Sequence, residues 1–561
     1  MNEKASFNLI DELWIRVLDD KGVAKEVSLL ELFRQAPRLQ CLINDLPTQD
    51  FAILRVLLAI LQRSISPMLD DLDEDVEPAE VWGQLWEASE LPMGAIEAYL
   101  SKWHDRFDLF DSERPFMQVP GLRTSRDECA PVSKIMSDVP DGDRLFSLRS
   151  GQKIDYLTFA EAARWLIHVQ AFDTAGIKSG VVGDSTVKGG KSYPRGTGWA
   201  GNLGGIFLEG ETLRETLLLN FVVWEDDDNE VFSPDDLPTW EQSLREFGSL
   251  DALPVGHADI YTWQSRRVRL VADRGVVTGL VLTNGDKLEL KNMHRIESMT
   301  AWRRSKNQEK KLGQVPIYLP MSHRSNRALW RGLSSLFAPE NRDDGLAASF
   351  TPGVLAWAEY LTSANGGRRL SQSMHLHIHG TGLEYGTQSS VVTDLIDDTV
   401  LLSSFLLSPE GSPLVALACD CVGDADRAVV ALGNLVSNLL IAAGGDQDNI
   451  SDAANEAKTE AYFELDSLFR SWLASLNTDS DVVGERARWN CEARKVLDLL
   501  AKRYISEVGP QGITGRSRKR GKSGTWITSS IAERWFYSAI REALPLEGNA
   551  IVKEGSGSEK Q

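Results

Sequence analysis

The chain has 561 residues, 42% of them hydrophobic and 16 of them tryptophan, which is enough for two or three folding units with apolar cores. A formal net charge of −21 excludes a protein that coats DNA without discrimination. Five cysteines without a CxxC pair exclude a disulfide framework and a zinc ribbon. No signal-peptide pattern opens the sequence, and the apolar run 51–61 is too short for a bilayer. We therefore expect a cytoplasmic protein without membrane contact.

The first part of the chain is typical of mixed α and β structure. Strand-like residues 13–17 lead through a turn into a second strand, and helical spacing of apolar residues covers 50–66. Two alternating segments, 276–282 and 287–290, are joined at Asn284-Gly285, which predicts a β-hairpin.

After about residue 395 the pattern becomes helical throughout. Apolar residues recur at three- and four-residue spacing in 426–443, 453–474, 481–507 and 529–543, which predicts a four-helix bundle. We therefore expect an α+β fold, with a large mixed domain over 1–395, a C-terminal bundle over 396–549 and a disordered tail over 550–561.

A glycine-rich segment interrupts the mixed part. Between Gly176 and Gly205, ten of thirty residues are glycine, and four others are Lys178, Lys188, Lys191 and Arg195. Glycine lets the backbone come close to a ligand, and interleaved cations favour a polyanion such as the phosphates of nucleic acid. The alternative is a long solvated connection between strands.

Two short motifs resemble the end of a phosphate-binding P-loop. They are Gly190-Lys191-Ser192 and Gly521-Lys522-Ser523, but the glycine required five positions before the last one is replaced by Ser185 and Arg516. More glycine follows the first motif, where a P-loop needs a helix that faces the phosphates. The sequence does not favour an NTPase.

Three histidines alternate in His375, His377 and His379, so in a strand they share one face. Three imidazoles can bind zinc, but the outer pair is too far apart along a strand to share an ion easily. A half-buried polar strand face is favoured, and no metal or cofactor is expected. The interpretation is a non-catalytic binding protein. The alternative is a stand-alone nucleotide-binding or metal-dependent enzyme that uses the glycine loop or the histidine strand.

Several segments, in order, resemble the CasA family, the large subunit of the type I-E CRISPR surveillance complex called Cascade. They are 8–17 (NLIDELWIRV), 114–119 (RPFMQV), the glycine region followed by 213–220 (LRETLLLN), and 238–240 (PTW). The terminal helical bundle extends the likeness over nearly the whole chain.

The resemblance implies a DNA-recognition function. In this family the large subunit inspects double-stranded DNA for a short protospacer-adjacent motif, reads it mainly from the minor groove and opens the duplex for pairing with guide RNA. The implied partners are double-stranded target DNA, the crRNA and other Cascade subunits, and the helicase-nuclease that the subunit helps to recruit.

The resemblance also places three DNA-facing elements. The loop that faces the minor groove maps to 175–180, with expected contacts at Gly176, Ile177, Lys178, Ser179 and Gly180. The glutamine wedge that parts the strands maps to Gln388, beside Thr387. A lysine finger on a β-hairpin maps to Lys287, in preference to Lys291.

Two further sites complete the expectations. The loop 145–153 resembles the family's docking element for the crRNA end and backbone protein, with Phe146, Arg149 and Lys153 as expected contacts. Near the C-terminus, five of the seven residues 516–522 are cations in an otherwise acidic bundle. These five are expected to contact duplex phosphates and are Arg516, Arg518, Lys519, Arg520 and Lys522.

Overall fold

The computed structural model describes residues 5–70, 78–139, 154–223, 233–244, 253–337, 342–343, 345–520 and 523–546. The chain divides into two compact units. Unit 1 comprises Met1–Leu329, Ser335–Ser371 and Leu376–Val400. Unit 2 comprises Trp330–Ser334, Gln372–His375 and Leu401–Gln561. The expected disordered tail lies outside the described residues.

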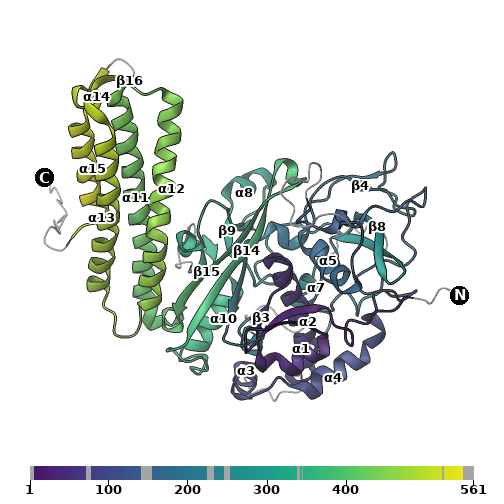
Figure 1. The fold of residues 1–561 in the computed structure, drawn as a ribbon. Helices are drawn as coiled ribbons and strands as arrows, with labels where there is room; N and C mark the ends of the chain where they lie inside the picture. The colour runs from purple at the N-terminus through teal and green to yellow at the C-terminus, as the bar shows by residue number, and fades with distance from the viewer. Residues whose placement is uncertain are drawn as a thin grey trace. The chain divides into compact units, whose positions relative to one another are not determined.

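The elements follow one another as labelled in Figure 1. The helices are α1 (Leu29–Gln35), α2 (Pro47–Asp70), α3 (Pro78–Glu87), α4 (Met93–Lys102), α5 (Phe159–Phe172), α6 (Leu213–Leu219), α7 (His257–Tyr261), α8 (Lys306–Leu312), α9 (Leu333–Leu336), α10 (Gly353–Thr362), α11 (Ser412–Ala443), α12 (Gln447–Ser475), α13 (Val482–Glu507), α14 (Gly509–Thr514) and α15 (Ser529–Ala543). The strands are β1 (Ile15–Asp19), β2 (Ala24–Val27), β3 (Leu39–Leu42), β4 (Lys178–Ser179), β5 (Lys191–Ser192), β6 (Gly205–Glu209), β7 (Arg266–Asp273), β8 (Val276–Asn284), β9 (Trp302–Arg304), β10 (Tyr318–Pro320), β11 (Arg342–Asp343), β12 (Leu346–Ala347), β13 (Ser349–Phe350), β14 (His375–Tyr385), β15 (Val392–Ser403), β16 (Arg516–Arg520) and β17 (Ser523–Ile527).

The N-terminal elements confirm the predicted strand–turn–strand and the first long helix. β1 pairs with β2 so that Ile15 lies opposite Val27, and Gly22 takes the left-handed φ of 73° that the turn requires. β3 adds to the other edge of β1. The predicted helix 50–66 lies within α2, whose apolar side chains from 51 to 61 are buried.

The hairpin predicted at Asn284-Gly285 is wrong. β8 pairs antiparallel with the preceding strand β7. The chain turns between them at Arg274-Gly275, where both φ angles are positive. The stretch after Asn284 forms no strand, and Gly285 is buried against the backbone at Gln264. Gly285 is therefore required for close backbone packing and not for a turn, which is why its sequence pattern was misleading.

A long hairpin of β14 and β15 forms a three-stranded sheet with β6 in the order β15-β14-β6. The register of β14 against β6 places His379 opposite Phe207 and Thr381 opposite Gly205. The end of this hairpin that carries residues 385–392 belongs to unit 1, as does the glycine-rich segment.

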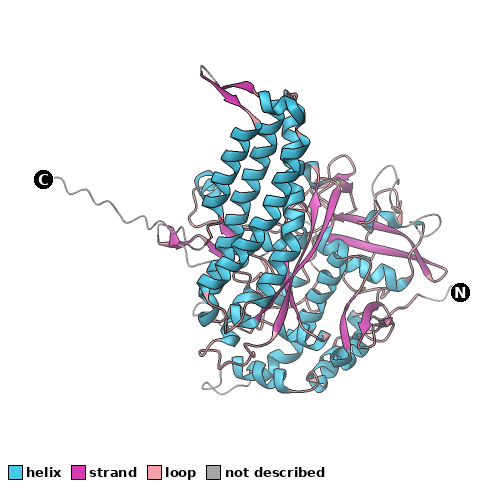
Figure 2. Ribbon diagram, turned by 60° about the vertical axis from the view of Figure 1, so that its left-hand side comes forward, coloured by secondary structure: helices cyan, strands magenta, loops and turns pink. Residues whose placement is uncertain are grey.

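The C-terminal part confirms the predicted bundle of α11, α12, α13 and α15, and with it the α+β fold class (Figures 1 and 2). The expectation of helix throughout after about residue 395 is wrong, because β15 runs to Ser403 and β16 and β17 are strands. Its core is rich in aromatic rings, since the Trp489 ring lies 5.1 Å from that of Phe469 and 5.6 Å from that of Trp472. At Gly433 the helices α11 and α12 come so close that a Cβ atom would lie 3.2 Å from the Ala454 carbonyl oxygen.

Within the described part of the chain, two helices have the length and apolarity of a membrane span: Pro47–Leu69 and a segment from Pro409 to Ala443. Within unit 1, the first has 78% of its most apolar window buried in the protein; within unit 2, the second has 61%. Both have the burial expected of core helices.

His168 is a fully buried histidine in α5. Its Nε2 atom lies 2.9 Å from the Thr48 hydroxyl, and its ring stacks on Phe172 at a centroid distance of 5.2 Å. Burial disfavours the charged imidazolium and lowers the pKa of His168 to about 3, although the charge of Asp173 acts in the opposite direction. The folded protein therefore holds this ring neutral.

We predict that unit 1 loses stability in acid through this histidine. In the unfolded chain His168 takes up a proton near pH 6.5 and in the folded chain only near pH 3, so its contribution is complete above pH 6.5 and falls as the pH decreases. The loss amounts to about 1.4 kcal/mol per pH unit below 6.5. The free energy of unfolding, measured in urea between pH 7 and pH 4.5, should depend less steeply on pH for His168→Gln than for wild type. Equal slopes would contradict the assignment.

Candidate nucleic-acid interface

The C-terminal end of α5 is the starting point of the candidate site. The helix begins with a capping box, in which the Thr158 hydroxyl accepts from the Glu161 N–H and the Glu161 carboxylate accepts from the Thr158 N–H. It ends at Asp173, whose backbone is extended and whose side chain is buried. The glycine-rich segment leaves α5 at this residue.

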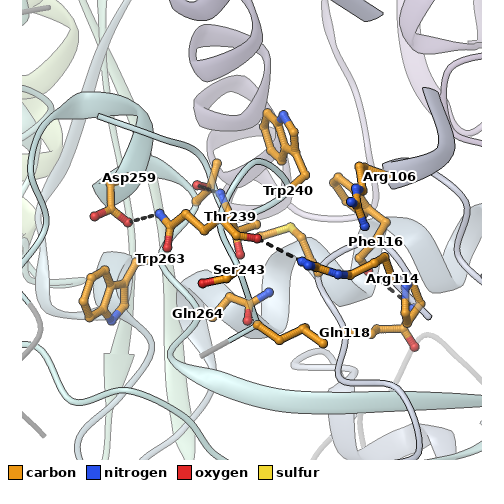
Figure 3. A pocket seen from close by; sticks show the side chains of 15 residues that line it. Arg106, Arg114, Phe116, Gln118, Thr239, Trp240, Ser243, Asp259, Trp263 and Gln264 are labelled. Carbon is orange, nitrogen blue, oxygen red and sulfur yellow. Dashed lines mark hydrogen bonds between the residues drawn. The ribbon is translucent and has the colours of Figure 1, made fainter. Parts of the chain in front are cut away.

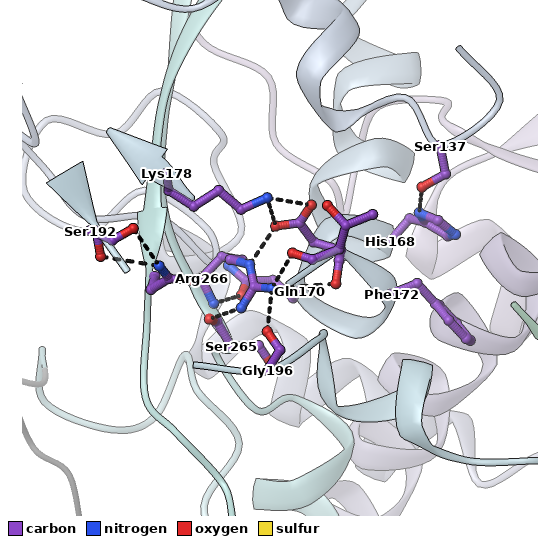
Figure 4. A network of polar contacts seen from close by, with 12 residues as sticks. Ser137, His168, Gln170, Phe172, Lys178, Ser192, Gly196, Ser265 and Arg266 are labelled. Atoms are coloured by element: carbon purple, nitrogen blue, oxygen red, sulfur yellow. Dashed lines mark hydrogen bonds and ion pairs between the residues drawn. The ribbon is translucent and has the colours of Figure 1, made fainter. Parts of the chain in front are cut away.

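A buried charge cluster surrounds Asp173 (Figure 4). Its carboxylate accepts from the Arg266 guanidinium and lies 2.7 Å from the Lys178 ammonium. Burial acts to raise the pKa of Asp173, but the two cations outweigh it and lower the pKa. Burial lowers the pKa of Lys178. The cluster therefore holds one anion between two cations inside the protein.

Arg266 also organises the backbone around this cluster. Its Nη2 atom donates to the carbonyl oxygens of Thr174 and Gly196, both at 2.9 Å, and its own backbone N–H donates to Gln170 at 2.9 Å. One side chain at the start of β7 thus fixes both the beginning and a later point of the glycine-rich segment (Figure 4).

The glycine-rich segment contains a short hairpin of β4 and β5, in which Ser179 lies opposite Lys191. Gly180 is buried and donates its N–H to the Gly190 carbonyl at 2.9 Å. A Cβ atom on Gly180 would lie 2.8 Å from the Gly190 backbone and 2.5 Å from Val187. This glycine is therefore needed for packing within the hairpin.

Gly176 and Ile177 form the open part of the loop. A Cβ atom on Gly176 would find its nearest neighbours at 3.8 Å on Thr174 and 3.9 Å on the Ser390 carbonyl, which is ordinary contact. The Ile177 side chain is 55% exposed, and Ser179 is exposed as well. Of the five residues expected here to contact DNA, these three have the accessibility that a ligand requires.

The cations of the segment fall into two groups. Lys178, only 11% exposed, and Arg195 are engaged inside the protein, the latter donating to the Gly285 carbonyl at 2.9 Å and to the Thr186 hydroxyl at 2.7 Å. Lys188 and Lys191 are exposed. The ammonium of Lys178 is thus paired with Asp173, and its expected contact with DNA stays a prediction. Lys191 lies across the hairpin from Ser179 and, like Lys188, is accessible to a ligand.

Gln388 lies in the turn between β14 and β15. Gln388 and Ser389 have φ angles of 57° and 51°, and the Ser390 N–H donates to the Thr387 carbonyl at 3.3 Å. Two consecutive left-handed residues closed by such a bond define a type I′ turn. Gln388 and Thr387 are exposed, and the Gln388 amide has no hydrogen-bond partner among the described residues.

The structure brings the glycine loop and the Gln388 turn together, although about 210 residues separate them. The Ala175 N–H donates to the Ser389 carbonyl at 2.7 Å. The Tyr385 hydroxyl donates to the Phe172 carbonyl at the end of α5, also at 2.7 Å. The two segments, both placed by the family resemblance, are therefore in direct hydrogen-bonded contact.

Lys287 is exposed and follows β8 directly, but it does not lie on a hairpin turn. The neighbouring Asp286 is buried and paired with Arg267 at 2.8 Å, so its charge is compensated internally. Just before it, the Gly285 carbonyl accepts from Arg195 of the glycine-rich segment. Lys287 is therefore an accessible cation on a stretch of chain held against that segment.

Phe146, Arg149 and Lys153 of the expected docking loop lie outside the described residues, so that site stays a prediction. In unit 2, β16 and β17 form a hairpin in which Arg516 lies opposite Ile527 and Arg518 opposite Thr525. Arg516 is exposed. Lys522 and the side chains of Arg518, Lys519 and Arg520 lie outside the described residues.

The histidine strand is half-exposed, as predicted. His375 and His377 are exposed on β14, and the residues between the histidines are buried. On the neighbouring strand, Glu209 lies 3.2 Å from His379 and 3.9 Å from His377. Burial acts to raise the pKa of Glu209. Hydrogen bonds from the two histidines outweigh this effect and lower the pKa of Glu209 to about 2. Among the described residues, no group of three or more His, Cys, Asp or Glu side chains is arranged to hold a metal ion.

The first P-loop-like motif is part of the β4–β5 hairpin. Gly189 and Gly190 have positive φ angles of 59° and 74°, and Lys191 and Ser192 form β5. The next helical turn is the short 3₁₀ segment Trp199–Asn202, and not a helix directed at a phosphate. The second motif lies largely outside the described residues.

Two segments that carry the family resemblance meet at a pocket shown in Figure 3. The Arg114 guanidinium donates to the Gln242 carbonyl at 3.1 Å, and the Gln242 amide donates to Asp259 at 2.9 Å. The rings of Phe116 and Trp240 stack with a centroid distance of 5.9 Å. These contacts join the two segments within unit 1.

Comparison with known proteins agrees with this arrangement. The family model described as CRISPR-associated protein Cse1 matches residues 8–500. The crystal structure of Cse1 from Thermobifida fusca is 39% identical, covers 96% of this chain and 98% of its own, and superposes with a TM-score of 0.85. The protein CasA/Cse1 from Thermus thermophilus is 28% identical over 418 residues, which are 73% of this chain and 74% of that protein. A chain of a CRISPR RNA-guided surveillance complex shares the fold at 18% identity and a TM-score of 0.68, covering 95% of this chain and 99% of its own.

We predict that Arg266→Met destabilises unit 1 strongly. The substitution leaves Asp173 buried with Lys178 alone and releases the carbonyls that Arg266 holds, at a cost of about 3 kcal/mol or more. Lys178→Met introduces the same apolar side chain but keeps the Arg266 contacts, so it should cost less. Urea unfolding of both variants at pH 7 measures the difference. If Lys178→Met lost more free energy of unfolding than Arg266→Met, Lys178 would contribute more to stability than Arg266, and the prediction would be wrong.

Proposed function

The chain belongs to the family of CRISPR-associated protein Cse1, and we propose that it is the DNA-recognising large subunit of a type I-E CRISPR surveillance complex. In this proposal it reads a protospacer-adjacent motif from the minor groove, opens the duplex for crRNA pairing and helps to recruit a helicase-nuclease. It acts by binding and not by catalysis. The observation that carries the proposal is the hydrogen-bonded contact between the glycine loop and the Gln388 turn.

The glycine loop has the shape that minor-groove reading needs. Gly176 has no Cβ, so its backbone can approach base edges closely. Ile177 and Ser179 supply an apolar and a hydroxyl side chain at the same exposed surface. Because the minor groove presents a degenerate pattern, such a loop discriminates among motifs without requiring a single one.

Gln388 is placed to act as the wedge. Its side chain is exposed at the tip of a tight turn and its amide is free to pair with a base edge. Side chains that enter a base step cost a few kcal/mol in unstacking, and that cost is offset by the new contacts that opening permits. The Ala175–Ser389 hydrogen bond keeps this tip beside the motif-reading loop.

In this proposal, exposed cations around this surface bind the DNA phosphates. Lys191, opposite Ser179, and Lys287 are both exposed, and Lys287 stays the candidate for the lysine finger. The ammonium of Lys178 supports the loop from within. The loop 145–153 with Phe146, Arg149 and Lys153 is proposed to dock the subunit on the crRNA end.

We predict that Gln388→Ala slows duplex opening in the assembled complex more than it weakens the first contact with DNA. The wedge offsets part of the unstacking cost, so R-loop formation on linear, relaxed DNA should slow roughly tenfold. Gln388→Asn keeps the amide on a shorter side chain, so its rate of R-loop formation should lie between those of wild type and Gln388→Ala. A target with a pre-opened bubble at the first base pairs is the control, because opening is not needed there. R-loop formation at the wild-type rate on the closed duplex would refute the wedge assignment.

We predict that the basic hairpin of unit 2 contributes sequence-independent affinity. Neutralising Arg516, Arg518, Lys519, Arg520 and Lys522 should weaken binding to every duplex about equally and leave the motif preference unchanged. The salt dependence should become shallower by roughly 0.9 in log–log slope for each phosphate that the hairpin no longer binds. Neutralising Lys495 and Lys502, which pair with Glu492 and Asp498 on α13, is the control. An unchanged slope in the five-residue variant would leave the hairpin without a phosphate role.

A further inference from the structure

The Gln388 turn has a conformation that its own sequence does not favour. Type I′ turns select Asn-Gly because both central residues need positive φ, yet this turn is built from Gln388 and Ser389. Left-handed backbone is costly for residues with a Cβ, and such strain persists only where the surroundings impose it. The contacts that impose it are therefore part of how the turn works.

The first of these contacts joins backbone to backbone. The Ser389 carbonyl accepts from the Ala175 N–H at 2.7 Å, so the second strained residue is fixed by the residue that precedes Gly176. Ala175 is buried, and the Ser390 carbonyl lies close to Gly176. Any displacement of the glycine loop is consequently transmitted to the turn.

The second contact anchors the strand that leads into the turn. Tyr385, the last residue of β14, donates its hydroxyl to the Phe172 carbonyl at 2.7 Å. Gly201 packs directly against that hydroxyl, which leaves no room for another side chain. Burial raises the pKa of the Tyr385 phenol, so the group stays a hydrogen-bond donor at all physiological pH values.

We propose that Tyr385 and the Ala175–Ser389 hydrogen bond are a coupling device: they make motif recognition by the glycine loop and strand opening by Gln388 one linked event. The proposal rests on the proposed function of the two elements. Tyr385 donates its hydroxyl inside unit 1 and acts as a positioning residue. A correct motif that settles against Gly176 and Ile177 fixes Ala175, and Ala175 fixes the turn that carries Gln388.

Coupling and simple support lead to different results. If the two contacts only stabilise the protein, their removal lowers stability and leaves the ratio of opening rates on good and poor motifs unchanged. If they couple the two elements, their removal reduces that ratio, while the ratio of initial binding affinities stays the same. The opening ratio is therefore the diagnostic quantity.

The test uses the reconstituted complex with two variants of this chain. Tyr385→Phe removes one hydroxyl and is the cleaner variant. Ala175→lactic acid replaces the amide N–H with an ester oxygen, and it also makes the Thr174 carbonyl a weaker acceptor for Arg266. Tyr462→Phe is the matched control, because its hydroxyl makes a hydrogen bond of the same 2.7 Å length to Asp426 within the bundle. Opening is followed by stopped-flow fluorescence of 2-aminopurine placed beside the motif.

For each of the two variants we expect opening at a good motif to slow roughly three- to tenfold, the effect of one hydrogen bond. The good-to-poor opening ratio should fall by a similar factor. On a target with a pre-formed bubble, both variants should form R-loops at the wild-type rate. Tyr462→Phe should open the closed duplex at the wild-type rate and with the wild-type good-to-poor ratio. If Gln388→Ala slows opening while both variants keep the wild-type ratio, the coupling is refuted and the proposed function stands. If Gln388→Ala has no effect either, the proposed function fails and the coupling fails with it.

Discussion

The buried contact between Asp173 and Arg266 is the interaction on which the candidate interface depends. A buried carboxylate is costly unless it is paired and fully hydrogen-bonded, and here Arg266 and Lys178 both compensate it. Because Arg266 also holds the carbonyls of Thr174 and Gly196, the charge cluster and the backbone of the glycine-rich segment form together. The Gln388 turn in turn depends on the same helix end through Tyr385. One ion pair therefore lies at the helix end to which both elements of the candidate interface are attached.

The placement of positive charge is consistent with the proposed role of an acidic chain at DNA. Several arginines are paired with buried acids, as in Arg55–Glu297 and Arg267–Asp286, both at 2.8 Å. Such cations stabilise the fold and are not available to phosphate. With a net charge of −21, the chain offers only local attraction at exposed lysines such as Lys191 and Lys287. Affinity for DNA is then expected to come from the assembled complex, while this subunit contributes discrimination at a few points.

Sequence reasoning succeeded where local periodicity decides the structure and failed where distant partners do. The four bundle helices follow from apolar spacing alone. The hairpin at Asn284-Gly285 failed because a glycine required for close packing has the same local signature as a turn glycine. The pairing of Lys178 with Asp173 could not be predicted, because no local pattern reveals that Asp173 also binds an arginine from β7. The contact between Ala175 and Ser389 is equally invisible in a linear reading.

Gln388 shows how strain can distinguish a functional turn from an ordinary one. The residue has no unusual chemistry, and by composition alone it is one polar residue in a surface loop. In the structure it begins a pair of left-handed residues at a position where Asn-Gly would be less strained. An unstrained turn would tolerate many orientations of its tip, whereas this one is held by Ala175 and closed by Ser390. In the proposed function, strain retained in this way presets the backbone of the turn before any ligand arrives, and this pre-organisation lowers the entropy lost when the turn meets a base step.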